Sequence, residues 1–161
     1  PTKRMRDDSS GDKSPADHDL TLLVGEPPEE INAHAQVLAL CSDFFRATLS
    51  GSWLEAQSQT VKLPDLAPAD VRLLLEYVAP CSEVKLAGKN IAVLLPLFSR
   101  LQMTESLHRA DNMLSKPIPT HELKEMPSDV ACLRLAVDAS LPMAREYLLN
   151  QLKKKLVENL G

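Results

Sequence analysis

Residues 33–42 read AHAQVLALCS, and this stretch decides the fold of the chain. Its apolar residues between 35 and 40 predict a short helix. Ser42 and Asp43 then form a pair typical of an N-terminal cap, so a second helix is expected to start there. Its apolar residues fall at helical spacing before Gly51 ends it, and they are Phe44, Phe45, Ala47 and Leu49. Two consecutive short helices therefore stand at the centre of the predicted domain.

Upstream of this centre the sequence predicts a β-hairpin. The apolar run at 20–24 is short and is ended by Gly25 and two prolines, which favours a buried strand over a helix. Residues 30–33 are expected to return as its partner strand. Before the hairpin, residues 1–17 contain almost no large apolar side chain. Such a segment cannot offset the entropy lost on ordering, so it is predicted to be a disordered tail.

Downstream, strands and helices alternate. The pattern predicts a strand at 60–63, a helix between Ala67 and Pro80, a short strand at 84–86, a helix from Asn90 to Leu101, and a helix at 104–114. Asn90 is expected to cap its helix, and Pro96 to bend it or to mark an irregular turn.

The C-terminal part is predicted to be helical beyond a proline-containing linker at 116–128. Helices are expected within 129–161, with a break at Leu141 and Pro142. The predicted organisation is thus a tail (1–17), a main domain (18–115), the linker and a helical extension. Both arrangements of the extension, packed on the main domain or swinging free, remain open.

Charge and cysteine content narrow the class of partner and the compartment. A net charge of -4 and a pI near 5.6 give no general reason to bind nucleic acid or an anionic membrane. Cys41, Cys81 and Cys132 lie far apart and are interpreted as buried small hydrophobes in a reducing compartment. No apolar run is long enough to span a bilayer. Cytoplasm and/or nucleus is the expected location.

Two basic clusters leave alternatives open. Residues 3–6 fit a nuclear-import patch or, as four residues are few for such a signal, a solvated tail. The lysines at 153–155 fall late in the last helix, where cations complement the helix dipole, and a solvated face is favoured there over nucleic-acid binding.

Motifs for catalysis, cofactors or metals are lacking from the sequence. It contains no glycine-rich nucleotide loop, zinc-protease motif or nucleophile elbow, and its histidines are scattered. A dyad of Cys41 and His34 has no third group and no oxyanion hole to support it. The chain is therefore predicted not to be an enzyme, with no catalytic, cofactor-binding or metal-binding residue.

Four ordered stretches, at 19–25, 33–42, 44–47 and 61–65, resemble the BTB/POZ domain family. They are similar to the family's strand beginning with Asp, its A-H-x-x-V-L-A-x-x-S helix, its F-R pair and its V-x-L-x-D strand. The wider resemblance runs from about residue 17 to 114. It implies an α+β BTB/POZ fold, in which a short β-sheet is flanked by a cluster of α-helices. The helices at 131–160 resemble the BACK or shorter box extension that follows this domain in cullin-binding adaptors.

The resemblance implies a protein-interaction module, and in particular a substrate adaptor of a cullin-RING ubiquitin ligase. A cullin-type scaffold, a second copy of the chain and an unknown substrate protein are the implied partners. The segment 53–55 looks like the hydrophobic-x-Glu motif of cullin-binding members, although Trp53 would equally fit a cap on the domain's own core. The contact residues predicted in this way are Phe45, Leu49, Trp53, Glu55 and Phe98.

The sequence also departs from the family pattern. Ala35 stands where many members carry Lys or Arg, which in the transcription-repressor branch joins an acidic residue, here Asp19, in a charged pocket. The polar tail does not supply the N-terminal strand and helix of that branch's dimer interface. The alternative function, a nuclear regulator that recruits transcription or chromatin proteins, rests on the cluster at 3–6.

Overall fold

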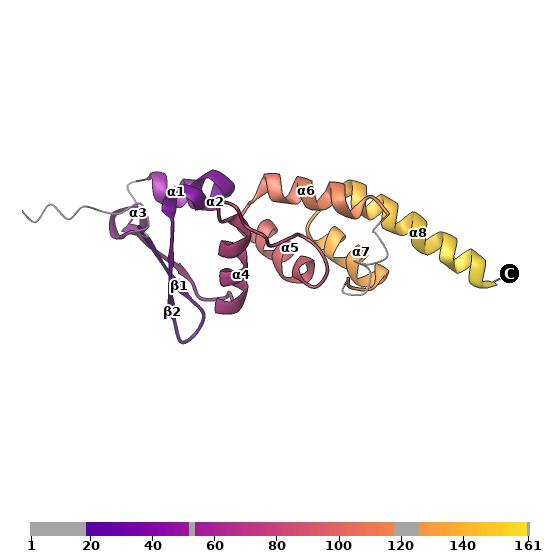
Figure 1. The fold of residues 1–161 in the computed structure, drawn as a ribbon, viewed down its shortest axis with the longest axis horizontal. Helices are drawn as coiled ribbons and strands as arrows, with labels where there is room; N and C mark the ends of the chain where they lie inside the picture. Colours follow the sequence, from indigo (N-terminus) through magenta and orange to yellow (C-terminus); the bar gives the residue numbers. More distant parts are fainter. Residues whose placement is uncertain (1–18, 52–53, 118–125, 161) are drawn as a thin grey trace, which may run out of the picture.

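The computed structural model describes residues 19–51, 54–117 and 126–160, and it has the predicted α+β architecture (Figure 1). A small sheet lies at one end, and the helices run away from it towards the C-terminus. In chain order the elements are β1 (Leu20–Val24), β2 (Glu29–Ala33), α1 (Ala35–Cys41), α2 (Asp43–Ser50), α3 (Leu54–Ser58), β3 (Thr60–Leu63), α4 (Pro68–Val78), α5 (Asn90–Arg100), α6 (Thr104–Leu114), α7 (Asp129–Asp138) and α8 (Pro142–Leu160).

β1 is the central strand of a three-stranded sheet with the order β2-β1-β3. It pairs antiparallel with β2, which confirms the predicted hairpin, and parallel with β3. Leu22 lies opposite Ile31 on one side and Val61 on the other. All three side chains are buried, because residues directly opposite each other share one face of a sheet. This face forms the floor of the core.

Gly25 allows three elements to meet at the end of β1. Its φ of +79° lies in the left-handed region that glycine adopts without steric cost. A Cβ at this position would lie 3.3 Å from Cδ of Pro68 at the start of α4. The Gly25 N–H also donates to the carbonyl of Leu63 in β3 at 3.1 Å. A side chain here would therefore strain the backbone and crowd Pro68.

The core of the main domain is built on this floor by helices α1, α2, α4 and α5. Phe45 of α2 and Phe98 of α5 are its largest fully buried side chains. The ring of Tyr77 in α4 packs on Phe98 with centroids 5.2 Å apart. Aromatic residues are few in this chain, and the contact between Tyr77 and Phe98 joins α4 to α5.

Two local predictions between α4 and α6 are wrong. Residues 84–86 form no strand, since β1, β2 and β3 are the strands of the described chain and none pairs with them. Asn90 is the first residue of α5 rather than its cap, and its side-chain amide donates to the carbonyl of Lys85 at 3.3 Å. α5 also continues through Pro96. Pro96 and Ala92 are both exposed, so water can hydrogen-bond the carbonyl that the missing N–H leaves free.

The cysteines occupy three different environments, which corrects the prediction that all are buried. Cys132 is buried in α7, Cys41 is half-buried, and Cys81 is exposed at a positive φ of 61°. Cys81 follows Pro80 beyond the end of α4, where an apolar side chain finds no core to enter.

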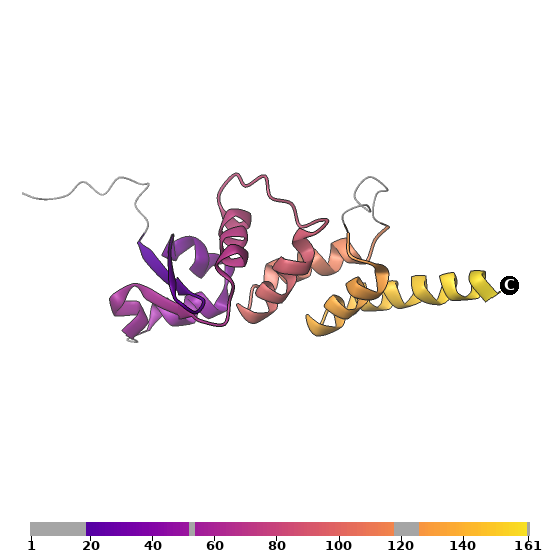
Figure 2. The ribbon, with the colours of Figure 1, turned by 90° about the horizontal axis from the view of Figure 1, so that it is seen from below.

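The C-terminal extension packs on the main domain, which decides between the two arrangements left open by the sequence. α7 contacts α5, and α8 lies along α6 (Figures 1 and 2). Asp111 of α6 is 6% exposed, and its carboxylate accepts from the N–H of Ala144 at 2.7 Å and of Met143 at 3.4 Å. It thus caps the first turn of α8 from a different helix. Within the described residues, no helix combines the length and apolar character needed to cross a membrane.

Candidate docking surface

The N-terminus of α2 is fixed by Ser42, as the sequence predicted. Its Oγ accepts from the N–H of Phe45 at 3.2 Å and donates to the carbonyl of Leu101 at 2.5 Å. The N–H of Asp43 donates to the carbonyl of Gln102 at 3.2 Å. These bonds join the start of α2 to the end of α5, so the outer face of α2 has a defined orientation.

A groove runs between that outer face of α2, the short helix α3 and the edge strand β3. It has a volume of about 340 Å³ and is lined by Phe44, Ala47, Thr48, Glu55, Val61 and Lys62. The half-buried Phe44 packs edge to face against Phe45, with centroids 5.2 Å apart and an angle of 79°. The groove therefore combines an apolar wall with one carboxylate and one ammonium group, which suits recognition of an apolar side chain beside a polar one.

The structure distributes the five predicted contact residues between the groove, the helix surface and the core. Glu55 lines the groove, and Leu49 is partly buried on α2. Phe45 and Phe98 are 1% and 0% exposed, which corrects their placement on the surface. A side chain without accessible surface supports the helices from within and cannot anchor a partner directly. Trp53 lies outside the described residues.

Of the individual contact residues that were predicted, Glu55 is the one found among the described residues that line the groove. Phe44, Ala47 and Thr48 follow the spacing i, i+3 and i+4, which places them on one face of α2. That spacing was available in the sequence. The contribution of Val61 and Lys62 was not, because it depends on the edge position of β3 in the sheet.

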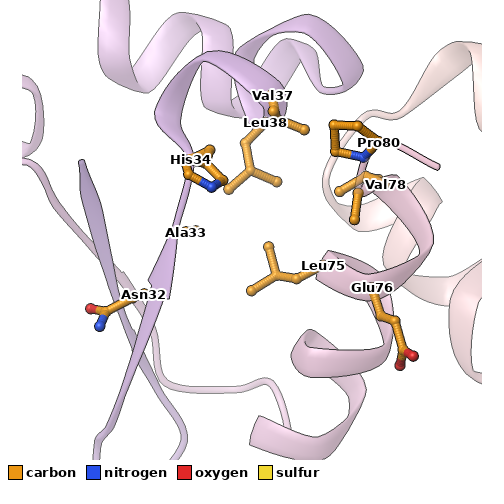
Figure 3. Close-up of a pocket in the computed structure, with 10 residues that line it drawn as sticks. Asn32, Ala33, His34, Val37, Leu38, Leu75, Glu76, Val78 and Pro80 are labelled. Carbon is orange, nitrogen blue, oxygen red and sulfur yellow. The ribbon is translucent and has the colours of Figure 1, made fainter. Parts of the chain in front are cut away.

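A second cavity of about 340 Å³ lies between the end of β2, the start of α1 and the end of α4 (Figure 3). Its walls are mainly apolar, and Leu75 points from α4 towards β2. Beside it, the Asp19 carboxylate accepts from the N–H of Ala35 at 2.7 Å and so caps α1. The predicted neighbourhood of Asp19 and residue 35 is therefore present, but the donor to Asp19 is a backbone group and Ala35 brings no cation.

The residues considered for catalysis or metal binding lie apart in the described part of the chain. His34 and Cys41 stand at opposite ends of α1, about 10 Å apart along the helix axis. Burial raises the pKa of the Cys132 thiol, and the nearby Asp129 carboxylate raises it further, so this thiol stays protonated. Among the residues that the structure describes, no three His, Cys, Asp or Glu side chains lie close enough to hold a metal ion.

Comparison with known proteins shows that the chain is similar to one domain family and to several related proteins. The model of the BTB/POZ domain family matches residues 12–118. The chain is 34% identical to human Kelch-like protein 2 over 87 residues, which are 54% of this chain and 14% of that protein. Kelch-like protein 3 from Danio rerio shows the same identity and coverage, and human Kelch-like protein 3 is 33% identical over 84 residues. The chain thus spans only 14% of the length of these relatives.

Proposed function

Since the chain belongs to the BTB/POZ domain family, we propose that it is a protein-interaction module, not an enzyme, and that it serves as a substrate adaptor of a cullin-RING ubiquitin ligase. The cullin-type scaffold would dock on the groove between α2, α3 and β3. The substrate protein would be bound elsewhere, and neither nucleic acid nor a membrane is required. Cytoplasm and/or nucleus is the location we propose for this activity.

The observation that carries this proposal is the position of Glu55 in the groove beside Phe44. Glu55 belongs to the segment that resembles the cullin-binding motif, so the resemblance and the groove point to the same residue. A carboxylate next to an apolar wall can fix the register of a partner whose apolar side chain enters the groove. A stable contact of this kind buries about 1,200–2,000 Å² in total, so α2 and its neighbours would form its centre.

Reversal of the charge at Glu55 tests the site. We expect Glu55→Lys to weaken binding of the purified chain to the N-terminal domain of a BTB-binding cullin by at least about tenfold, because it places repulsion inside the interface. Isothermal titration calorimetry measures the affinity. Glu83→Lys makes the same charge change in the loop between α4 and α5, outside the groove, and serves as the matched control.

Two experiments test the docking site and the adaptor function separately. If Glu55→Lys and Glu83→Lys both bind the cullin domain as the unmodified chain does, the groove is not the docking site. Gel filtration with light scattering of the unmodified chain mixed with the cullin domain should give a joint peak. Two separate peaks at concentrations well above the affinity of such complexes would overturn the adaptor proposal itself.

Self-association is a second candidate, favoured by one observation. Leu40 of α1 is 76% exposed, although it lies in the apolar stretch at the centre of the domain. An exposed leucine on α1, the helix whose Val37 and Leu38 line the apolar cavity of Figure 3, suits contact with a second copy. The mass of the chain alone, measured by light scattering, shows directly whether it self-associates. The basic cluster at 3–6, on which the nuclear-regulator alternative rests, lies outside the described residues, and Asp19 faces the N–H of Ala35 without a cation.

A further inference from the structure

Strand β3 lies at the edge of the sheet, with β1 as its neighbour on one side. The N–H of Thr21 donates to the carbonyl of Gln59 at 2.9 Å, and the N–H of Gly25 donates to the carbonyl of Leu63 at 3.1 Å. These two bonds lie at the two ends of the parallel pairing between β1 and β3. Since successive residues of a strand direct their backbone groups to opposite sides, the residues of β3 at odd positions face β1.

Thr60 and Lys62, at the even positions, direct their backbone N–H and C=O groups to the open side of β3. In the part of the chain that the structure describes, no further strand pairs with β3 there. A neighbouring strand can satisfy such a row of alternating donors and acceptors, because its own groups alternate in the same way. A helix cannot, since its backbone groups are already bonded within the helix. The open side of β3 therefore selects an extended partner segment.

The groove between α2, α3 and β3 borders this open side, because Lys62 of β3 lines it. Val61 and Leu63 point into the core, so the exposed Lys62 lies on the outer face of the sheet. An added strand would follow the same alternation. Its inward side chains would meet Phe44 and Ala47 of α2, and an outward one would lie opposite Lys62.

Two charged side chains line the groove, Glu55 from α3 and Lys62 from β3. Neither occurs among the ion pairs of the described chain. Lys62 favours a carboxylate directly across the strands, and Glu55 favours a cation where the segment passes α3. A segment with charges of one sign would be repelled by one of the two residues. The groove therefore fits a segment that carries a carboxylate and a cation at different positions.

A second copy of the chain fits this edge less well than a different partner does. Two β3 edges would bring their Lys62 side chains onto one face of the joined sheet, and a lysine on an edge strand opposes such pairing. β3 has four residues, so two copies would share few backbone bonds. A partner segment with a carboxylate opposite Lys62 replaces that repulsion by attraction.

We propose that the groove binds an extended segment of the docked partner as a fourth strand beside β3. The segment alternates apolar side chains, which enter the groove beside Phe44, with polar ones, of which a carboxylate lies opposite Lys62. In strand addition the backbone bonds supply affinity and the alternate side chains supply specificity. The inference rests on the proposed function for the use of the groove in docking, and it adds the form in which the partner's chain enters.

Proline at position 62 tests the backbone contact. Lys62→Pro removes an N–H on the open side and keeps the ladder with β1, because an edge strand tolerates proline where the N–H faces solvent. Lys62→Ala removes the same charge and keeps the N–H, so it is the matched control. Calorimetry with the N-terminal domain of a BTB-binding cullin should show Lys62→Pro binding at least about tenfold more weakly than Lys62→Ala. Lys62→Ala itself should lose only about threefold, since an exposed ion pair contributes little.

Amide exchange gives a second measurement, on the unmodified chain, that decides the question even if the proline variant does not fold. Bound cullin domain should slow exchange of the Lys62 amide, measured by nuclear magnetic resonance, at least about tenfold, whereas the Leu63 amide faces β1 and is the control. Either equal binding by the two variants or an unslowed Lys62 amide would overturn strand addition, and the proposed function would stand as long as the unmodified chain forms a joint peak with the cullin domain.

Two other results would also overturn the inference. Without a joint peak, the proposed function fails and strand addition fails with it. A dimer of the chain alone that Lys62→Pro dissociates and Lys62→Ala does not would mean that the fourth strand comes from a second copy.

Discussion

Ser42 holds the junction of α1, α2 and α5 through a single hydroxyl group. It is 1% exposed, and its Oγ both caps α2 and donates to the carbonyl of Leu101. A buried hydroxyl that satisfies two backbone groups stabilises more than a cap at the surface, because its loss leaves a buried carbonyl unpaired. Ser42 is therefore the residue on which the orientation of the docking groove most depends.

We expect Ser42→Ala to lower the free energy of unfolding by about 2 kcal/mol, from the lost cap and the unpaired carbonyl together. Urea denaturation followed by circular dichroism measures the change. Ser50→Ala is the control, since Ser50 is exposed at the opposite end of the same helix. A loss for Ser42→Ala no larger than that for Ser50→Ala would show that the hydroxyl is not part of the framework.

Phe44 and Phe45 show how far the sequence alone predicts which side chain is buried. The sequence predicted that Phe44 and Phe45 belong to one amphipathic helix, and the structure confirms it. Which ring enters the core depends on how α2 rotates against α5, and that rotation is fixed by the bond from Ser42 to Leu101. The sequence does not contain this distance, so Phe45 was named as the contact residue in place of Phe44.

At the scale of elements, the first turn of α8 is capped by a residue of α6, which lies 33 positions before Ala144. The carboxylate of Asp111 accepts from the first-turn N–H groups of α8, where a negative charge also favours the helix dipole. Rules for helix caps consider the neighbouring residues, and here those are Leu141 and Pro142, so the sequence predicted a break without its cause. The bond joins the extension to α6 by polar contacts as well as by packing.

We expect Asp111→Ala to destabilise the chain by about 1–2 kcal/mol and to increase amide exchange in the first turn of α8. Asp111→Asn keeps a carbonyl acceptor in the same position and should restore most of the loss. Hydrogen exchange followed by mass spectrometry measures the change in the exchange of the α8 amides. If the alanine and asparagine variants exchange alike, hydrogen bonding by Asp111 does not hold the helix.

Two short elements were not predicted correctly from the sequence. Residues 84–86 have the composition of a strand, but a strand exists only beside another strand, and the described sheet ends at β2 and β3. α3 was not predicted at all, since its five residues are too few for a periodic pattern. The elements longer than these were placed within a few residues of their observed bounds.

The whole molecule shares one core between the main domain and the extension. Leu148 and Cys132 of the extension belong to the same cluster of buried residues as Leu22 and Phe98. The family match stops at residue 118, yet the packing does not. The predicted division at 116–128 is therefore a division of the sequence more than of the folded structure, and unfolding should involve both parts together.

Removal of residues 129–161 tests this unity. The truncated chain would expose the sides of α5 and α6 that α7 and α8 now cover, so we expect a lower urea midpoint and a stronger tendency to aggregate. The intact chain should unfold in a single transition seen alike by circular dichroism and by tyrosine absorbance, which reports on Tyr77 in α4 and Tyr147 in α8. An unchanged midpoint after truncation would mean that the main domain is stable by itself.

The parallel pairing of β1 with β3 has a kinetic consequence. Leu22 meets Ile31 across a tight hairpin, a contact between near neighbours in the chain, whereas Thr21 meets Thr60 only after a long segment has closed. Local pairs form quickly, and distant pairs wait for loop closure. The hairpin should thus nucleate early, and β3 should join late. Because β3 forms one wall of the groove, recognition of a partner there would be among the last properties that a newly folding chain acquires.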